Sequence, residues 1–125
     1  MMLSGKKILI VDDNDLNIFA LRATLKPKGP TLFTAKDGKE CLDYLRNNPA
    51  VDLVLLDMMM PVMDGYQTLA EMRKDAVLKD IPVIALTAQA MIGDREKCRQ
   101  AGANDYCSKP VNIDTLLNII NSLIP

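Results

Sequence analysis

Four apolar stretches of this chain each end in polar residues whose side chains could do chemistry: Asp12 and Asp13, Asp57, Thr87, and Lys109. Carboxylates brought together repel one another unless a cation neutralises them, and oxygen ligands without His or Cys suit Mg²⁺. A carboxylate beside Mg²⁺, a hydroxyl and a lysine amine can accept a phosphoryl group, because these groups neutralise charge on its equatorial oxygens. The residue types therefore predict phosphoryl transfer, with Asp57 as the nucleophile.

Taken one at a time, the same residues have simpler structural explanations. Asp13 or Asn14 could cap a following helix, and Thr87 could cap a later one. Asp57 could be a turn residue, and Lys109 could be a solvated surface lysine. Their joint placement at the ends of four different apolar stretches favours the functional interpretation.

The composition limits the kinds of protein that this chain can be. At 125 residues, with 49% hydrophobic and 25% charged residues, it has the size and make-up of one folded globular domain. Its formal net charge of -1 gives no bulk attraction toward nucleic acid or anionic membrane, so we expect neither as a direct partner. The histidine count of 0 excludes Ser-His-Asp and Cys-His catalysis and a phosphohistidine of its own.

Cysteine usage and hydropathy favour the cytoplasm. Cys41, Cys98 and Cys107 are odd in number and lack C-x-x-C spacing, which argues against a disulfide framework and predicts small core residues. No apolar run approaches the roughly 20 residues needed to span a bilayer. The last helical pattern runs directly to Pro125, so we expect one domain over residues 1–125 with no output domain.

Short apolar stretches alternate with helical patterns five times along the chain. Strands are predicted at 7–11, 32–35, 51–56, 81–86 and 105–108, and helices at 15–26, 41–47, 66–73, 89–101 and 113–124. In the first helix, the apolar residues near helical spacing are Leu16, Phe19, Ala20, Ala23 and Leu25. Strands that are apolar throughout predict a parallel sheet covered on both faces, the doubly wound α/β arrangement. Because ligands bind such sheets outside the carboxyl ends of the strands, we expect the polar residues to share one site.

The chain resembles the receiver domains of two-component response regulators over essentially its whole length. Four segments carry the resemblance, in the expected order at the strand ends: 8–14 (ILIVDDN), 55–65 (LLDMMMPVMDG), 82–88 (PVIALTA) and 101–110 (AGANDYCSKP). Any one of them is modest evidence, whereas the four together are highly specific. The resemblance implies a flavodoxin-like five-stranded parallel sheet with strand order 2-1-3-4-5, flanked by five helices.

The resemblance also implies a role for each site residue. Asp57 would take a phosphoryl group from a histidine of a partner, which would be a histidine kinase or a histidine phosphotransfer protein. Asp12 and Asp13 would organise Mg²⁺ together with Asp57 and the backbone carbonyl of Met59, and Lys109 would contact the acyl phosphate. The chain would then be a signalling switch that phosphorylates and dephosphorylates itself rather than a turnover enzyme.

Thr87 and Tyr106 are the residues expected to change on phosphorylation. In receivers, the hydroxyl at the Thr87 position moves to the phosphoryl group and the aromatic ring at the Tyr106 position turns inward. The surface formed by the fourth helix, fifth strand and fifth helix then changes for a downstream protein target. From the residue alone, Tyr106 would instead be a fixed strand aromatic packed against the fourth helix.

The three methionines after Asp57 allow two interpretations. Met58, Met59 and Met60 could form an apolar flap that belongs to the core, or a gate over the phosphorylation site that tunes hydrolysis. Met59 and Gln89 lie two residues after Asp57 and Thr87, where the family resemblance places them beside the route of attacking water. We expect their identities to influence the lifetime of the phosphoryl group.

Three other classes of protein share parts of this pattern. A haloacid-dehalogenase-like phosphatase also uses an Asp nucleophile after a strand, but it needs an acid two residues later, where this chain has Met59. A flavodoxin-like nucleotide or flavin binder needs a Gly-rich phosphate cradle, whereas the first loop here is Asp12-Asp13-Asn14. A degenerate receiver that only docks other proteins would not need the intact acidic set, Thr87 and Lys109.

The start of the first helical segment bears on the pathway. The run of residues 12–17 (DDNDLN) looks more like receivers of hybrid histidine kinases than like stand-alone response regulators, which slightly favours a phosphorelay role. The resemblance leaves open which kinase and output the chain serves, and whether phosphorylation drives dimerisation.

Overall fold

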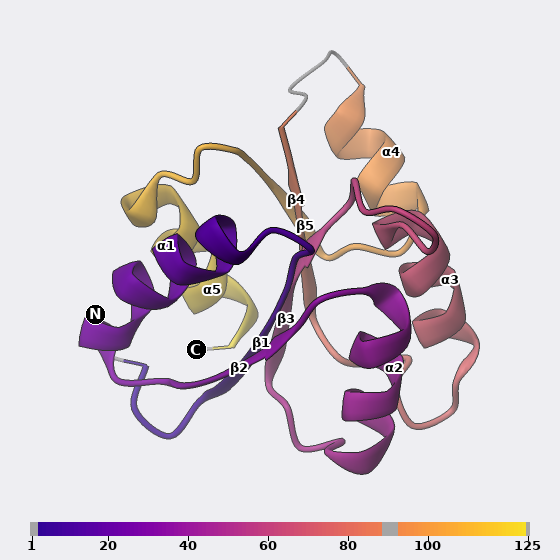
Figure 1. The fold of residues 1–125 in the computed structure, drawn as a ribbon, viewed down its shortest axis with the longest axis horizontal. Helices are drawn as coiled ribbons and strands as arrows, with labels where there is room; N and C mark the ends of the chain where they lie inside the picture. Colours follow the sequence, from indigo (N-terminus) through magenta and orange to yellow (C-terminus); the bar gives the residue numbers. More distant parts are fainter. Residues whose placement is uncertain (1–2, 89–92, 125) are drawn as a thin grey trace.

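A computed structural model describes residues 3–88 and 93–124 and contains one five-stranded parallel sheet. The strand order is β2-β1-β3-β4-β5, as the resemblance to receiver domains implies, and all four neighbouring pairs run parallel. Figure 1 labels the elements along the chain. The strands are β1 (Lys7–Val11), β2 (Thr31–Ala35), β3 (Leu53–Asp57), β4 (Val83–Thr87) and β5 (Asp105–Ser108). The helices are α1 (Asp15–Leu25), α2 (Gly38–Asn47), α3 (Gly65–Lys74), α4 (Asp94–Gln100) and α5 (Ile113–Leu123), with a short 3-10 turn at Lys26–Lys28.

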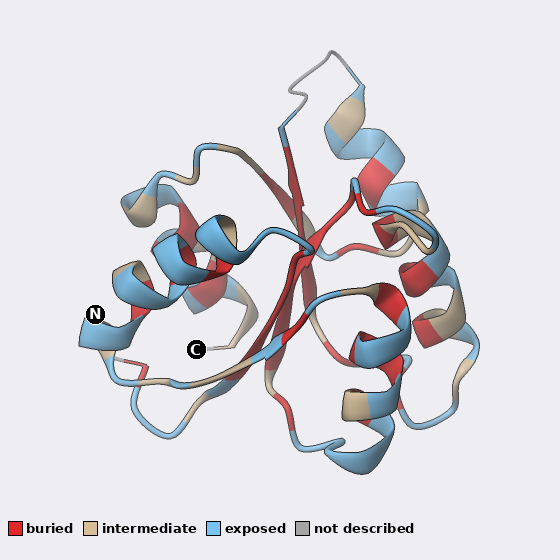
Figure 2. Cartoon of the chain, viewed as in Figure 1, coloured by how far each residue is buried: buried red, intermediate tan, exposed pale blue. Residues whose placement is uncertain are grey.

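The helices form two layers on opposite faces of the sheet. Helices α1 and α5 cover one face, and α2, α3 and α4 cover the other (Figure 1). All residues of β3 and β4 are buried, so the red strands in Figure 2 lie between two apolar layers. A strand that is covered on both faces is apolar at nearly every position, which explains the apolar runs in the sequence; Asp57 and Thr87 are the polar last residues of β3 and β4.

Two predicted boundaries differ from the structure in an informative way. The third strand is predicted at 51–56 but begins at Leu53, because the Asp52 carboxylate accepts a hydrogen bond from the backbone N–H of Lys7 at 2.8 Å just before it. The strand also ends one residue later than predicted and includes Asp57. The fourth helix is predicted at 89–101; its first four residues lie outside the described ranges, and α4 begins at Asp94.

The buried face of α1 is not the one suggested by the apolar spacing. Its buried residues are Ile18, Leu21 and Leu25, whereas Leu16 and Phe19 are 77% and 72% exposed. Spacings of three and four residues place Ile18, Leu21 and Leu25 on one stripe against the sheet. The helix itself is confirmed, but only Leu25 of the predicted apolar residues contributes to its buried face.

Two further features of the chain bear on its cysteines and on membranes. Cys41, Cys98 and Cys107 are free and buried, as predicted for small core residues. Within residues 3–88 and 93–124, no helix has both the length and the apolar character needed to span a bilayer.

Candidate active site

The predicted polar residues lie where the order of the strands reverses. The chain passes from β1 outward to β2 and then returns to the other side of β1 to form β3, β4 and β5. Asp12 follows β1, and its backbone N–H donates to the carbonyl of Ala35 at 3.1 Å, at the end of β2. Asp57 is the last residue of the adjacent β3. This is the position at which doubly wound sheets bind their ligands.

Three carboxylates meet at this edge of the sheet. Asp12, Asp13 and Asp57 each place one oxygen within 4.8 Å of the other two. Asp12 and Asp57 are buried, while Asp13 is exposed, so the group opens to solvent on one side. The predicted convergence of the three side chains is therefore present in the structure.

Backbone amides hold two of these carboxylates in place. Asp12 Oδ1 accepts from the N–H of Asn14 at 2.9 Å, and Asp57 Oδ1 accepts from the N–H of Met59 at 3.0 Å. The Asn14 side chain in turn caps α1, because its Oδ1 accepts from the N–H groups of Leu16 and Asn17. Capping therefore belongs to Asn14, and the Asp13 carboxylate joins the acidic cluster instead.

Lys109 supplies a cation inside the acidic cluster. Its Nζ donates to Asp12 Oδ2 at 2.9 Å and lies 3.5 Å from Asp57 Oδ1. Its side chain is only 18% exposed, so the interpretation as a solvated surface lysine is wrong. The backbone N–H of Lys109 also donates to the carbonyl of Thr87 at 2.8 Å, which fixes the loop after β5 to the end of β4.

The surroundings of Asp57 raise the pKa of its carboxyl group. Burial is the largest cause of the higher pKa, and the negative charge of Asp12 adds to it. The Met59 N–H and the Lys109 ammonium act in the opposite direction but do not cancel the shift. A site that disfavours its own negative charge in this way favours the binding of an additional cation.

The donor set fits a hard divalent cation. It consists of carboxylate oxygens on three residues, with one exposed side through which water and a phosphoryl group can enter. Mg²⁺ prefers such ligands and usually keeps several waters, so one or two carboxylates plus substrate oxygens complete its shell. Asp12, Asp13 and Asp57 are the described residues that could hold the ion.

Thr87 and Tyr106 lie on the neighbouring strands β4 and β5. Thr87 is the buried last residue of β4 and pairs with Ser108 of β5. Tyr106 pairs with Ala85, two residues earlier on β4, and its ring is buried in the core between the sheet and α4. Burial raises the pKa of the Tyr106 phenol.

The loop between β3 and α3 divides the three methionines between two environments. Met58 and Met60 are buried in the core layer under α2, α3 and α4, while Met59 is 56% exposed. The flap interpretation therefore holds for Met58 and Met60, and Met59 alone stands at the surface. Gln89, the other residue expected beside the water route, lies outside the described residues.

Close packing joins the start of α3 to the residue after Asp57. A Cβ atom on Gly65 would lie 2.6 Å from Met58 Cα, so only glycine fits there without a shift. The N–H of Gly65 donates to the carbonyl of Met58 at 3.2 Å. Asp64 and Gln67 form a reciprocal capping box that begins the helix.

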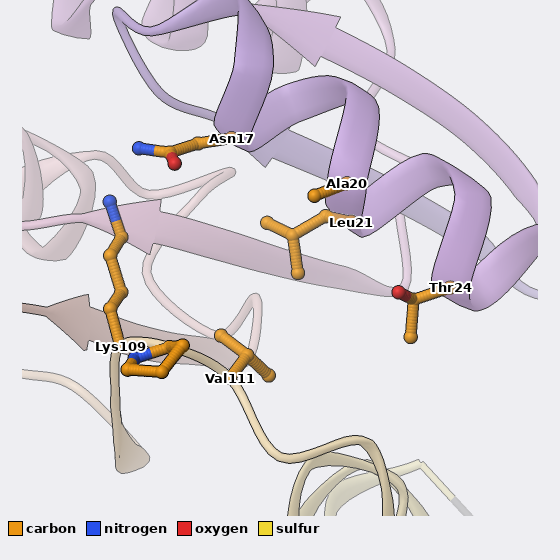
Figure 3. A pocket seen from close by; sticks show the side chains of 7 residues that line it. Asn17, Ala20, Leu21, Thr24, Lys109 and Val111 are labelled. Carbon is orange, nitrogen blue, oxygen red and sulfur yellow. The ribbon is translucent and has the colours of Figure 1, made fainter.

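A small cavity extends from Lys109 along α1. It has a volume of about 200 Å³ and lies between α1 and the loop after β5. Figure 3 shows Lys109 pointing toward Asn17 at one end of it. The other lining residues are Ala20, Leu21, Thr24, Pro110 and Val111.

Exposed apolar side chains flank the acidic cluster on two sides, which the sequence did not reveal. Leu16 and Phe19 project from the first half of α1, and Met59 and Val62 project from the loop after Asp57. The one hint in the sequence was that α1 contains more apolar residues than a single buried face of the helix can hold. Large exposed apolar groups close to a site are typical of protein–protein contact surfaces.

Comparison with known proteins identifies the family. Residues 8–121 match the model of the response regulator receiver domain. The chain is 36% identical over 119 residues to the polar-differentiation response regulator DivK of Brucella ovis, covering 95% of this chain and 96% of DivK.

Solved structures agree with the sequence match. The receiver domain of the sensor histidine kinase PA1611 from Pseudomonas aeruginosa, crystallised with a magnesium ion in its active site cleft, is 37% identical with a TM-score of 0.88; the match covers 97% of this chain and 98% of that one. The receiver domain of Ssk1 from Saccharomyces cerevisiae, crystallised with the histidine phosphotransfer protein Ypd1, is 26% identical with a TM-score of 0.86, covering 98% and 91%. The chain therefore belongs to the response regulator receiver domain family, whose members are phosphorylation-activated signalling switches.

Proposed function

We propose that Asp57 accepts a phosphoryl group from a phosphohistidine of a partner protein. The observation that carries this proposal is the position of Asp57, a buried carboxylate at the end of β3 that lies beside Asp12, Asp13 and the Lys109 amine. In the reaction, a carboxylate oxygen of Asp57 forms a bond to phosphorus while the nitrogen–phosphorus bond of the donor breaks. The bonding electrons return to the imidazole nitrogen, and the product is an acyl phosphate.

The metal requirement follows from the charge that gathers during this transfer. Asp12, Asp13 and Asp57, together with the backbone carbonyl of Met59, would hold Mg²⁺. The bound ion would neutralise part of the negative charge on the carboxylates and on the phosphoryl oxygens. The magnesium ion in the related PA1611 receiver domain supports this assignment.

Two side chains would respond to the new phosphoryl group. Lys109, which pairs with Asp12 and Asp57 before phosphorylation, would contact a phosphoryl oxygen. The Thr87 hydroxyl would bind another, since Thr87 ends the strand next to Asp57. The resulting shift at the end of β4 would reach Tyr106 on β5 and alter the surface formed by α4, β5 and α5, which a downstream protein would recognise.

We favour a switch over a phosphatase for this site. A haloacid-dehalogenase-like enzyme needs an acid two residues after its nucleophile, and here that residue is Met59, whose N–H binds Asp57 and whose side chain faces solvent. Residues 1–125 would act as one receiver domain. Phosphoryl uptake and loss would therefore change the state of the protein rather than turn over a substrate.

The partner would be a histidine kinase or a histidine phosphotransfer protein that docks around the acidic cluster. The exposed Leu16 and Phe19 on one side, and Met59 and Val62 on the other, provide apolar area for such a contact. The related Ssk1 receiver domain forms a complex with the phosphotransfer protein Ypd1, which supports this class of partner.

Intact-mass spectrometry after incubation with Mg²⁺ and acetyl phosphate tests the proposal. The wild type should gain one phosphoryl group, and Asp57→Asn or chelation of the metal should abolish the gain. Asp80→Asn is the matched control, because it removes an exposed carboxylate from the loop between α3 and β4 at the opposite edge of the sheet. Phosphorylation of Asp57→Asn at the wild-type rate would refute the assignment of the acceptor.

A receiver that accepts a phosphoryl group only from the phosphohistidine of its own partner would not react with acetyl phosphate. Beryllofluoride then serves as the probe, since it mimics a phosphoryl group on a carboxylate. Binding that needs both Mg²⁺ and Asp57 would support the proposal, and failure to bind would contradict it.

A further inference from the structure

The described residues of helix α4 make little apolar contact with the rest of the molecule. In the described range Asp94–Gln100, Cys98 alone is buried. The neighbouring α3 on the same face buries Leu69, Met72 and Thr68 as well as its first residue. Because burial of apolar side chains is the main force that holds a helix on a sheet, α4 needs other contacts to keep its position.

Two arginines of α4 reach one carboxylate on the edge strand β5. Arg95 Nη1 lies 3.7 Å and Arg99 Nη2 lies 3.9 Å from Asp105 Oδ1. The same oxygen accepts the backbone N–H of Tyr106 at 2.8 Å. The guanidinium of Arg95 also lies over the Tyr106 ring, 5.9 Å from its centroid, within the range of a cation–π contact.

A third cation connects α4 to α3. Lys97 Nζ lies 4.8 Å from the centroid of the Tyr66 ring, and the Tyr66 hydroxyl is 3.8 Å from Cys98 Sγ. Cations of α4 therefore make contacts on both of its sides, toward β5 and toward α3. We call these contacts of Arg95, Lys97 and Arg99 the α4 clamp.

We propose that the α4 clamp sets the resting position of the switch, with Arg95 and Arg99 acting as positioning residues that hold α4 on β5 over Tyr106. This inference deepens the proposed function, because it names what holds the unphosphorylated state. Arg95 and Arg99 are half exposed or more, with 61% and 50% of their side chains accessible. Such contacts are weak singly and are screened by salt, so α4 is held loosely enough to move.

The buried Cys98 thiol reports the opening of α4 without any phosphoryl donor. Iodoacetamide can alkylate it only when α4 lifts away, since burial shields the sulfur and raises its pKa. Peptide mapping separates Cys98 from Cys41, which lies fully buried on the inner face of α2 and serves as an internal reference for global unfolding. Because the alkylation assay uses no phosphoryl donor, its outcome does not depend on whether the proposed phosphotransfer to Asp57 is correct.

Variants at the two arginines test the inference directly. We expect Arg95→Gln to speed alkylation of Cys98 about threefold and the double variant with Arg99→Gln about tenfold, with Cys41 unchanged. Arg95→Lys should leave the rate of Cys98 alkylation close to that of the wild type, because it keeps the positive charge. Lys74→Gln is the matched control, since it breaks a surface ion pair of 3.9 Å with Glu71 within α3.

Salt provides an independent measure of the same contacts. Raising sodium chloride from 0.05 to 0.5 M should speed Cys98 alkylation in the wild type about threefold and leave the double variant almost unchanged. Equal rates for the wild type and the double variant would overturn the inference. So would an equal rise at Cys41 and Cys98, since it would mean that the variants weaken the whole fold rather than release α4.

Discussion

Replacing Lys109 is the strongest test of what holds the acidic cluster together before a metal or phosphate binds. Replacing it with Gln removes the cation that contacts both Asp12 and Asp57, whose side chains are only 1% and 5% exposed. Removing one partner of a buried ion pair costs roughly 3–5 kcal/mol, because the remaining charge is left uncompensated. Since Asp13 keeps one side of the cluster open to water, we expect the lower end of this range, about 3 kcal/mol without metal.

Magnesium should recover part of this loss. In Lys109→Gln the ion would replace the missing positive charge, so we expect it to bind the variant more tightly and stabilise it more than the wild type. A ligand present at ten times its dissociation constant adds about 1.4 kcal/mol to the free energy of unfolding. Urea denaturation in EDTA and in 10 mM Mg²⁺, followed by circular dichroism, measures both effects.

A second lysine provides the control for this experiment. Lys36 Nζ lies 2.9 Å from Asp15 Oδ1, the same distance as in the Lys109 to Asp12 pair, but both side chains are exposed. Lys36→Gln should therefore change stability little and leave the response to Mg²⁺ unaltered. If Lys109→Gln unfolds at the same urea concentration as the wild type in EDTA, the lysine does not compensate the buried carboxylates and the reasoning is wrong.

Three more predictions follow from single side chains. Asp57→Asn should raise the free energy of unfolding at pH 7 in EDTA, because the native state raises the pKa of this carboxyl and its ionised form therefore lowers stability. The gain should vanish in urea denaturation as the pH is lowered through that raised pKa. Arg73→Met should cost about 3 kcal/mol by urea denaturation, since the guanidinium donates to the carbonyls of Gly102 at 2.9 Å and Ile81 at 3.0 Å, which would lose their partner; wild-type stability would contradict this. Val62→Gly should stabilise by about 0.5–1 kcal/mol in thermal melts, because this fully exposed β-branched residue adopts a φ of 67° that glycine tolerates; a lower melting temperature would refute the argument.

The order of elements and the edge that carries the site could be predicted from the sequence alone. Continuous apolar runs occur where both faces of a strand are covered, and β3 and β4 are buried at every position. Once five such runs alternate with helices, the parallel topology brings residues after each strand to one edge. The proximity of Asp12, Asp13 and Asp57 follows from that topology, since β1 and β3 are neighbours.

Side-chain contacts were less predictable where two patterns compete. Helix α1 has more apolar residues than its buried stripe needs, so periodicity could not show that Ile18 and Leu21 face the core while Leu16 and Phe19 face solvent. Lys109 was predicted to join the site, but its resting contacts with Asp12 and Asp57 were not, because a long lysine side chain can reach either water or a carboxylate several ångströms away.

The contacts of α4 could not be predicted from its own sequence. Its charged residues Arg95, Lys97 and Arg99 have the composition of a solvated helix face. What each cation touches depends on residues of α3 and β5, and only the assembled sheet brings these together.

The glycine that begins α3 makes the surroundings of Asp57 more resistant to movement on one side than on the other. Gly65 lies directly against the backbone of Met58, with no room for a methyl group between them, and a hydrogen bond joins the same two residues. A displacement of Asp57 toward α3 would therefore be resisted, because it would have to compress the backbone atoms of Met58 and Gly65, which are already in contact. Helix α4, on the same face of the sheet, is held instead by charged contacts and, within Asp94–Gln100, by one buried cysteine. Strain that arose at Asp57 would therefore be relieved more easily by a movement of α4 than by a movement of α3.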